Sequence, residues 1–132
     1  MINKTLSNLQ EKEMKLKLSQ LIAMRGSLVK LIEKDLPIKQ SFNLAKFIKT
    51  ANEELEQFEQ QRVKLVNRYG AKDEEGNIAV KEENQQQFVN ELNELTEIEV
   101  DFEGFKPLKL ADLRNIYFTT NDMMSLIDIV EE

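Results

Sequence analysis

"SFNLAKFIKTANEELEQFEQQRVKLVNRYG", residues 41–70, decides the fold, because its apolar residues recur at alternating spacings of three and four. Arg62 takes the one polar position of a seam that otherwise consists of Leu44, Ile48, Ala51, Leu55, Phe58, Leu65 and Tyr69. Such a repeat predicts one long helix with an apolar stripe along one side. Gly70 is the expected stop, in the left-handed conformation that glycine favours at helix ends.

A second helix is expected from Glu82 to Leu95, because apolar residues again fall on one face. These residues are Phe88, Val89, Leu92 and Leu95. The segment that joins the two helices is short, so they should lie antiparallel. We therefore predict an intramolecular helical hairpin, and a dimeric coiled coil built on the same seam is the alternative.

Before the long helix, the sequence indicates a strand and a shorter helix. "MKLKLS", residues 14–19, alternates apolar and basic residues as a strand does. Ser19 is a candidate N-cap for the following helix, which should end before Pro37. The apolar stripe of that helix consists of Leu21, Ile22, Leu28, Val29 and Ile32.

After the hairpin, "EIEVDF", residues 97–102, alternates perfectly and predicts a strand. Its expected inner face carries Ile98, Val100 and Phe102. "NIYF", residues 115–118, is a candidate for another short strand. A last helix should begin near Thr120, capped by Thr119 or Thr120. Its apolar residues are Met123, Met124, Leu126, Ile127 and Val130.

These elements predict an α+β, mostly helical fold. A long antiparallel helical hairpin should dominate it, with additional N- and C-terminal helices and a small β element. The break in pattern at Met14 predicts an N-terminal extension, residues 1–13, ahead of a single helical-hairpin domain, residues 14–132. A domain of this size can bury a core without covalent staples.

Composition excludes several classes of function. The chain has no histidine and no cysteine, which removes the usual neutral-pH acid/base, the thiol nucleophile and disulfides. We therefore expect a non-enzymatic protein without a cofactor or a metal. No apolar run approaches the ~20 residues that a membrane span needs. The first residues lack a secretory apolar stretch, so a cytoplasmic protein is expected.

"YGAKDEEGNIAVKE", residues 69–82, partly matches an EF-hand calcium loop. With Gly76 at loop position 6, oxygen ligands fall on Asp73, Glu75 and Glu82. Position 1, which normally supplies a primary ligand, falls on Ala71. We therefore predict a turn between two helices, and a calcium site is the alternative.

A row of carboxylates alternates with the apolar residues of the second predicted strand: Glu97, Glu99, Asp101 and Glu103. Charges on the outer face of a strand protect it from edge-to-edge aggregation. Alternatively, carboxylates about 7 Å apart mimic nucleic-acid phosphates toward a basic host protein, or they hold a divalent metal. We take these four residues as the candidate protein-binding site.

Charge is segregated along the chain. Residues 1–52 carry ten Lys/Arg and four Asp/Glu, whereas residues 53–103 carry five and fifteen. Either the two parts pack beside each other, or the acidic part faces a basic partner, because such fields steer association. The basic residues are mostly lysines and accompany no recognised nucleic-acid motif, so direct nucleic-acid binding is not expected.

"KDLPIKQSFNLAKFIKTANEELEQFEQQRVKLVNRYGAKDEEGN", residues 34–77, is followed by "FVNELNELTEIEVDF", residues 88–102. This combination resembles small uncharacterised proteins encoded by phages and prophages of Gram-positive bacteria. The likeness covers roughly Met14 to the C-terminus. It implies a phage setting and a small accessory role, and it names neither a partner nor any site residue.

The leading hypothesis is therefore a phage-encoded, non-enzymatic accessory protein. It would bind a host or defence protein in the host cytoplasm through the acidic part of the chain, from Glu53 to Glu103. The alternative is a virion component or phage assembly factor that acts through oligomerisation. A carboxylate–metal enzyme is a third class. The sequence is compatible with a monomer or a small homo-oligomer.

Overall fold

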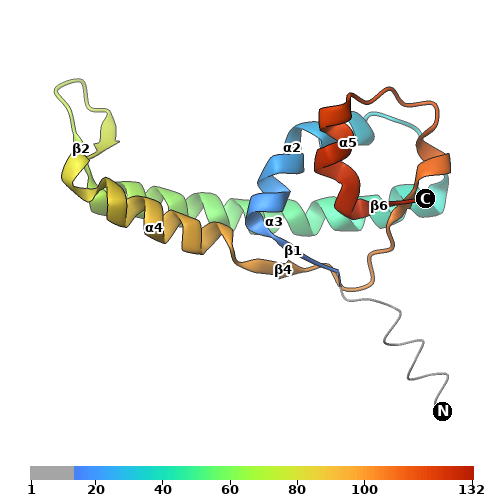
Figure 1. Cartoon of the computed structure of the whole chain (residues 1–132), viewed down its shortest axis with the longest axis horizontal. Helices are drawn as coiled ribbons and strands as arrows, with labels where there is room; N and C mark the ends of the chain where they lie inside the picture. Colours follow the sequence, from blue (N-terminus) through green and yellow to red (C-terminus); the bar gives the residue numbers. More distant parts are fainter. Residues whose placement is uncertain (1–13) are drawn as a thin grey trace, which may run out of the picture.

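Residues 14–132 are described in a computed structural model, and the expected extension, residues 1–13, lies outside the described residues. The described chain is mostly helical with small strand pairs, which confirms the predicted α+β, mostly helical class. Figure 1 shows a compact end from which one long helix and a shorter neighbour project. In this part of the chain, no helix is both long and apolar enough to cross a bilayer.

The helix predicted from the apolar seam is α3, Ile38–Tyr69, which has 32 residues and is therefore about 48 Å long. It begins directly after Pro37, whose fixed φ and missing amide hydrogen suit a helix start. Its buried residues all lie at or before Leu55, near the middle of the helix: Leu44, Phe47, Ala51 and Leu55. We call residues 56–96 the arm, and residues 14–55 together with 97–132 the head.

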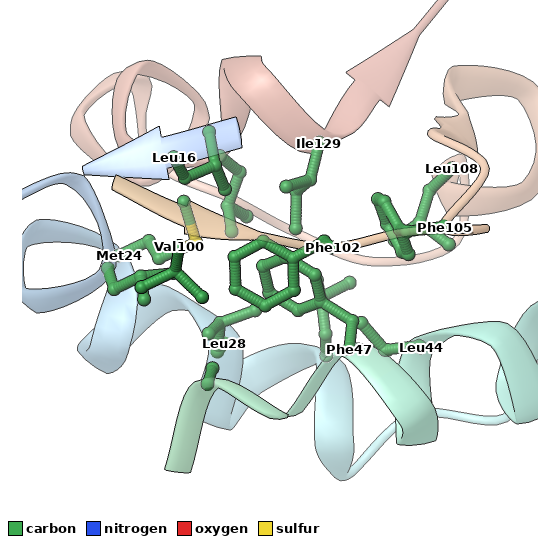
Figure 2. Packing of buried hydrophobic residues seen from close by; sticks show 14 of the residues in the cluster. Leu16, Met24, Leu28, Leu44, Phe47, Val100, Phe102, Phe105, Leu108 and Ile129 are labelled. Atoms are coloured by element: carbon green, nitrogen blue, oxygen red, sulfur yellow. The ribbon is translucent and has the colours of Figure 1, made fainter. Parts of the chain in front are cut away.

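The head contains the hydrophobic core. Buried side chains come from α2 (Leu18–Ile32), from α3 up to Leu55 and from the chain after residue 97. Figure 2 shows the rings of Phe47 and Phe102 in the middle of this cluster. Burial of large apolar side chains is the main stabilising contribution to folding, so the head supplies most of the stability.

α2 starts earlier than predicted and buries a different face. Lys17 takes the N-cap position, and its amide donates a hydrogen bond to Gln20 Oε1 at 2.8 Å, so the predicted Ser19 cap is wrong. The buried residues of α2 are Leu18, Leu21, Met24, Ser27, Leu28 and Leu31. Val29 and Ile32, which the predicted stripe included, are 53% and 57% exposed. The reason is that α5 packs against α2 more extensively than α3 does, and it selects another face.

The described residues contain two antiparallel strand pairs. β1 (Lys15–Lys17) pairs with β4 (Glu99–Asp101), as the alternation in both segments predicts. β2 (Gly70–Lys72) pairs with β3 (Ile78–Val80) directly after α3. A short 3-10 helix, Glu82–Asn84, then leads into α4.

The C-terminal part of the head differs from the prediction at one strand. "NIYF", residues 115–118, forms a turn and a connection, so the predicted strand there is wrong. Instead, β5 (Leu108–Lys109) runs parallel to β6 (Val130–Glu131). Local alternation cannot reveal this pairing, because it joins segments far apart in sequence. Short 3-10 helices lie at Leu110–Leu113 and Ile127–Ile129.

A polar cluster holds α5, Thr120–Leu126, against α2. Thr119 caps the helix, as one of the two predictions proposed: its Oγ1 accepts from the Asp122 amide at 3.0 Å. Asp122 Oδ1 accepts a hydrogen bond from the buried Ser27 hydroxyl at 2.8 Å, and Lys30 pairs with Oδ2. Lys30, the Thr119 amide and Ser27 all stabilise the carboxylate, so the pKa of Asp122 lies well below its usual range.

In the arm, α4 (Gln85–Thr96) lies along the C-terminal part of α3 (Figure 1). Arg68 and Glu91 form an ion pair at 3.5 Å, and Asn84 Nδ2 donates to the Tyr69 carbonyl at 3.2 Å. No residue of α4 is buried. The helix has only 12 residues, so it covers less than half of α3.

Gly70 ends α3 for a different reason from the predicted one. Its φ of −101° and ψ of 171° are extended, so the predicted left-handed stop is wrong. A Cβ atom at Gly70 would overlap the Val66 carbonyl oxygen and lie 2.8 Å from Ile78 Cγ2. Glycine is therefore required because the last turn of α3 and the neighbouring β3 leave no room for a Cβ atom.

Candidate protein-binding surface

The predicted acidic row lies on the two-stranded ribbon that β1 and β4 form. Leu16 and Val100 face each other on the inner side of the ribbon, and both are buried. The outer side carries the cross-strand pairs Lys15–Asp101 and Lys17–Glu99. Opposite charges at paired positions stabilise a ribbon. Basic and acidic segments therefore pack beside each other here, which is one of the two arrangements that the charge pattern predicted.

The other two members of the row lie outside the strand. Glu97 lies before β4, where its Oε2 accepts a hydrogen bond from Lys17 Nζ at 2.6 Å, and this bond raises the pKa of Lys17. Ile98 is 51% exposed, so its predicted inward position is wrong: the chain is still leaving α4 there. Glu103 is exposed in the tight turn after β4, next to Gly104, whose φ of +80° suits glycine.

One edge of β4 remains open. The Phe102 amide donates to the Met14 carbonyl at 2.8 Å, so these two residues form a hydrogen-bonded pair. In an antiparallel ribbon, such pairs alternate with residues whose amide and carbonyl groups point outward. Glu99 and Asp101 occupy these outward positions. Within residues 14–132, β1 is the only strand that pairs with β4, and Figure 1 shows the ribbon at the rim of the head.

A hollow of about 220 Å³ opens beside the C-terminal end of β4, between residues 101–105 and α3. Three aromatic rings line it, and Phe47 contacts both of the others. The Phe47 ring stacks on Phe102 with centroids 4.4 Å apart, and its centroid is 4.7 Å from that of Phe105. Figure 2 shows these rings at the meeting point of α3 and the chain after β4. The hollow therefore places three aromatic residues and several polar side chains next to an open strand edge.

Charged side chains surround these rings. Asp101 and Glu103, from the predicted row, line the hollow together with Lys46 of α3. Asn43 fixes the facing loop, because its Nδ2 donates to the Lys106 carbonyl at 2.6 Å and its Oδ1 accepts from the Lys106 amide at 3.2 Å. The structure thus brings two members of the row to one place and leaves Glu97 with Lys17.

Sequence reasoning missed the α3 side of this hollow. Phe47 did not belong to the seam, because the seam was traced through Leu44, Ile48 and Ala51. Its position three residues after Leu44 and four before Ala51 was a usable signal for a second core contact. Asn43 carried no comparable signal, since its partner lies 63 residues away.

The calcium-like stretch forms the predicted turn. Asp73 Oδ1 accepts hydrogen bonds from the amides of Glu75 and Asn77, both at 2.9 Å. Gly76 has a φ of +86°, which glycine adopts without strain. The Asp73 carboxylate is therefore already used by the backbone of the turn. Among the residues that the structure describes, no group of three or more acidic side chains is placed to hold a metal ion.

Comparison of the chain with protein-family models, curated proteins and solved structures finds no match to any of them. The resemblance to phage and prophage proteins therefore stays a prediction.

Proposed function

We propose that the protein is a non-enzymatic accessory protein that binds another protein at the open edge of β4. One observation supports this most: an unpaired strand edge, an aromatic hollow and the carboxylates of Asp101 and Glu103 lie together. A peptide segment that adds to a strand edge gains main-chain hydrogen bonds, and a side chain placed in an adjoining pocket gives specificity. The hollow supplies such a pocket.

The partner segment is extended and basic. Glu99 and Asp101 already face lysines of β1, so their charge is partly compensated within the ribbon. Glu103 is exposed in the turn beyond the strand pair. It is therefore the member of the row best placed to meet a basic side chain of the partner, and charges at such a rim accelerate association.

The resemblance to phage and prophage proteins supports a phage-encoded role in the host cytoplasm. In that setting the partner is a host or defence protein, and the protein acts as an adaptor or inhibitor without chemistry of its own. The lack of histidine and cysteine is in keeping with this role, because it removes the commonest catalytic groups.

One observation favours the alternative, a virion component or assembly factor that oligomerises. Two large apolar residues at the start of α3 are exposed: Ile38 to 83% and Phe42 to 66%. Lys46 Nζ lies 5.7 Å from the centre of the Phe42 ring. Exposed apolar residues that lie close together mark surfaces that contact other proteins.

Glu103→Lys tests the proposed surface, since Glu103 lies outside the strand pair and its replacement leaves the ribbon intact. Charge reversal at Glu99 or Asp101 would instead place like charges opposite the lysines of β1 and destabilise the ribbon. Glu74→Lys, at the exposed tip of the arm, is the matched control. It changes the net charge equally at a position remote from β4.

Tagged wild-type protein and both variants are expressed in a Gram-positive host during phage infection, and co-purifying proteins are quantified by mass spectrometry. We expect a host protein that wild type and Glu74→Lys capture and that Glu103→Lys loses. Equal capture by Glu103→Lys would show that the surface is wrong. Capsid or tail proteins as partners, with the protein present in purified virions, would favour the assembly role.

A further inference from the structure

The N-terminal segment, residues 1–13, joins the head at the border of the hollow beside β4. The Phe102 amide donates to the Met14 carbonyl at 2.8 Å, and Met14 packs against the core. β1 is antiparallel to β4, so the start of β1 lies at the C-terminal end of β4. Residues 101–105, at this end of β4, line the hollow. The segment is therefore attached next to a hollow of its own molecule.

The sequence of this segment combines a polar spacer with apolar residues. "QEKE", residues 10–13, contains no apolar residue, and Leu9 is the first apolar residue before it. Leu9 precedes Met14 by five residues, and a chain spans at most about 3.3–3.6 Å per residue. Leu9 is therefore held within about 18 Å of Met14. The hollow next to Met14 falls inside this reach.

A second hollow of the head is farther from the attachment point. It measures about 440 Å³ and is lined by Leu31, Ile32 and Leu36, among others, where α2 ends. α2 begins directly after β1, and Leu31 follows Leu18 by thirteen residues, which is about 20 Å of helix. The hollow beside β4 is therefore the nearer of the two for Leu9.

The hollow beside β4 suits one apolar side chain with polar neighbours. Its volume of about 220 Å³ is several times the roughly 30 Å³ of a water molecule. Phe47, Phe102 and Phe105 supply ring atoms against which a leucine can pack. Burial there is favourable because apolar surface leaves water. The other lining residues are mostly polar, as are the residues of the spacer: Asn43, Lys46, Thr50, Asp101 and Glu103.

Attachment to the same molecule favours this contact. Two groups that a short linker joins meet at an effective concentration in the millimolar range. A contact of only millimolar intrinsic affinity is then formed in about half of the molecules. A free peptide at micromolar concentration would leave the same hollow almost empty. The contact therefore needs little affinity of its own.

We propose that residues 1–13 cover the hollow beside β4 in the same molecule, with Leu9 seated against the aromatic rings. A protein that binds at the β4 edge must then displace Leu9. The apparent affinity for that protein is reduced to the fraction of molecules in which the hollow is free. This competition rests on the proposed function, whereas the occupation of the hollow does not.

Leu9→Ser in the full-length protein tests the occupation. Backbone amide chemical shifts of the isotope-labelled variant are compared with those of wild type. We expect changes at Phe47 and Thr50, which line the hollow from α3 and lie about forty residues away in the chain. Asn8→Ser is the matched control and should leave these two amides nearly unchanged. Circular dichroism verifies the helical content of both variants.

Two results of this comparison would overturn the proposal. In the first, Leu9→Ser leaves the amide shifts of Phe47 and Thr50 as they are in wild type. In the second, the changes appear only at Leu31 and Leu36, because the segment would then occupy the hollow at the end of α2.

Capture of the partner during infection tests the competition. We expect Leu9→Ser to capture more of the protein that Glu103→Lys loses. The gain is about tenfold if the hollow is free in about a tenth of wild-type molecules. Equal or weaker capture by Leu9→Ser would show that the segment does not compete.

The two experiments separate this inference from the proposed function. Unchanged shifts in Leu9→Ser, together with loss of capture by Glu103→Lys, would overturn the inference and leave the proposed function standing. Changed shifts at Phe47 and Thr50, together with full capture by Glu103→Lys, would confirm the occupation and contradict only the proposed partner surface.

Discussion

The head and the arm share one helix, but they are held together in different ways. Every buried hydrophobic residue of the described chain belongs to the head, where four stretches of sequence meet around Phe47. In the arm, α3 and α4 make a pair with no buried residue, supported by an ion pair and a β-hairpin. Regions with few buried contacts open at lower free energy than a core does. The head therefore supplies most of the buried apolar contacts, and the arm depends mainly on contacts at its surface.

A pair of phenylalanine substitutions gives the largest contrast between the regions. Phe47→Ala removes a fully buried ring from the head and should lower the free energy of unfolding by about 3–5 kcal/mol. Phe88→Ala removes the same atoms from the arm, where the ring is only half buried. We expect it to change the urea midpoint followed by circular dichroism much less. Equal losses from the two variants would show that head and arm unfold as one unit.

Asp122→Asn tests whether polar contacts stabilise the head in addition to its apolar core. The pKa of the Asp122 carboxyl is lowered in the folded state, chiefly by Lys30. Its contribution is therefore present above the unfolded pKa of about 3.9 and is lost as pH falls toward the lower folded pKa. We expect the variant to melt at a lower temperature at pH 7, with a difference that shrinks below about pH 4. Melting curves that stay equally far apart at every pH would contradict this.

Gly70→Ala should destabilise the arm and leave the stability of the head unchanged. The added methyl group overlaps the Val66 carbonyl at the point where β3 passes the helix end. Forced overlaps cost about 1–3 kcal/mol, and we expect that cost as faster amide exchange within residues 56–96. Gly26→Ala is the control, because a Cβ there meets nothing within 4 Å. In a helix this change should be neutral or stabilising. If Gly70→Ala also accelerated amide exchange in the head, the head and the arm would not be stabilised separately.

The smallest effect is expected at the outer side of the ribbon. Lys17 and Glu97 form an ion pair with side chains 44% and 60% exposed. Exposed pairs contribute little and are screened by salt. We therefore expect Glu97→Gln to leave the melting temperature unchanged within error at physiological salt. A clear drop in a differential scanning measurement would mean that the ribbon depends on this pair more than its exposure suggests.

Periodicity predicted the elements whose apolar residues are set by their own helix or strand. The α3 seam, the "MKLKLS" strand and the Thr119 cap all depend on residues within a few positions of each other, so the sequence contains the information. The mostly helical α+β class followed from these elements. The turn at Asp73 was predictable for the same reason.

The errors share a physical cause. Ser19, Val29, Ile98 and "NIYF" were misplaced because tertiary partners decided which face was buried and where each strand paired. Gly70 was predicted from the backbone freedom of glycine, whereas the last turn of α3 and β3 together leave no room for a Cβ atom there. At the candidate site, the four carboxylates were known from the sequence. The lysines opposite them and the Phe47 side of the hollow come from segments distant in the chain.

α3 is one continuous helix whose fully buried residues end at Leu55, and beyond this point it has only partly buried contacts, such as Phe58, and the neighbouring α4. A change in the tilt of α3 at the core would therefore displace the far end of the helix. From Leu55 to Tyr69 the helix is about 21 Å long. A tilt of about 10° at the core would move Tyr69 by roughly 4 Å over that length. The hollow beside β4 lies against the buried end of α3, so any tilt of the helix that accompanied binding there would be largest at the tip of the arm.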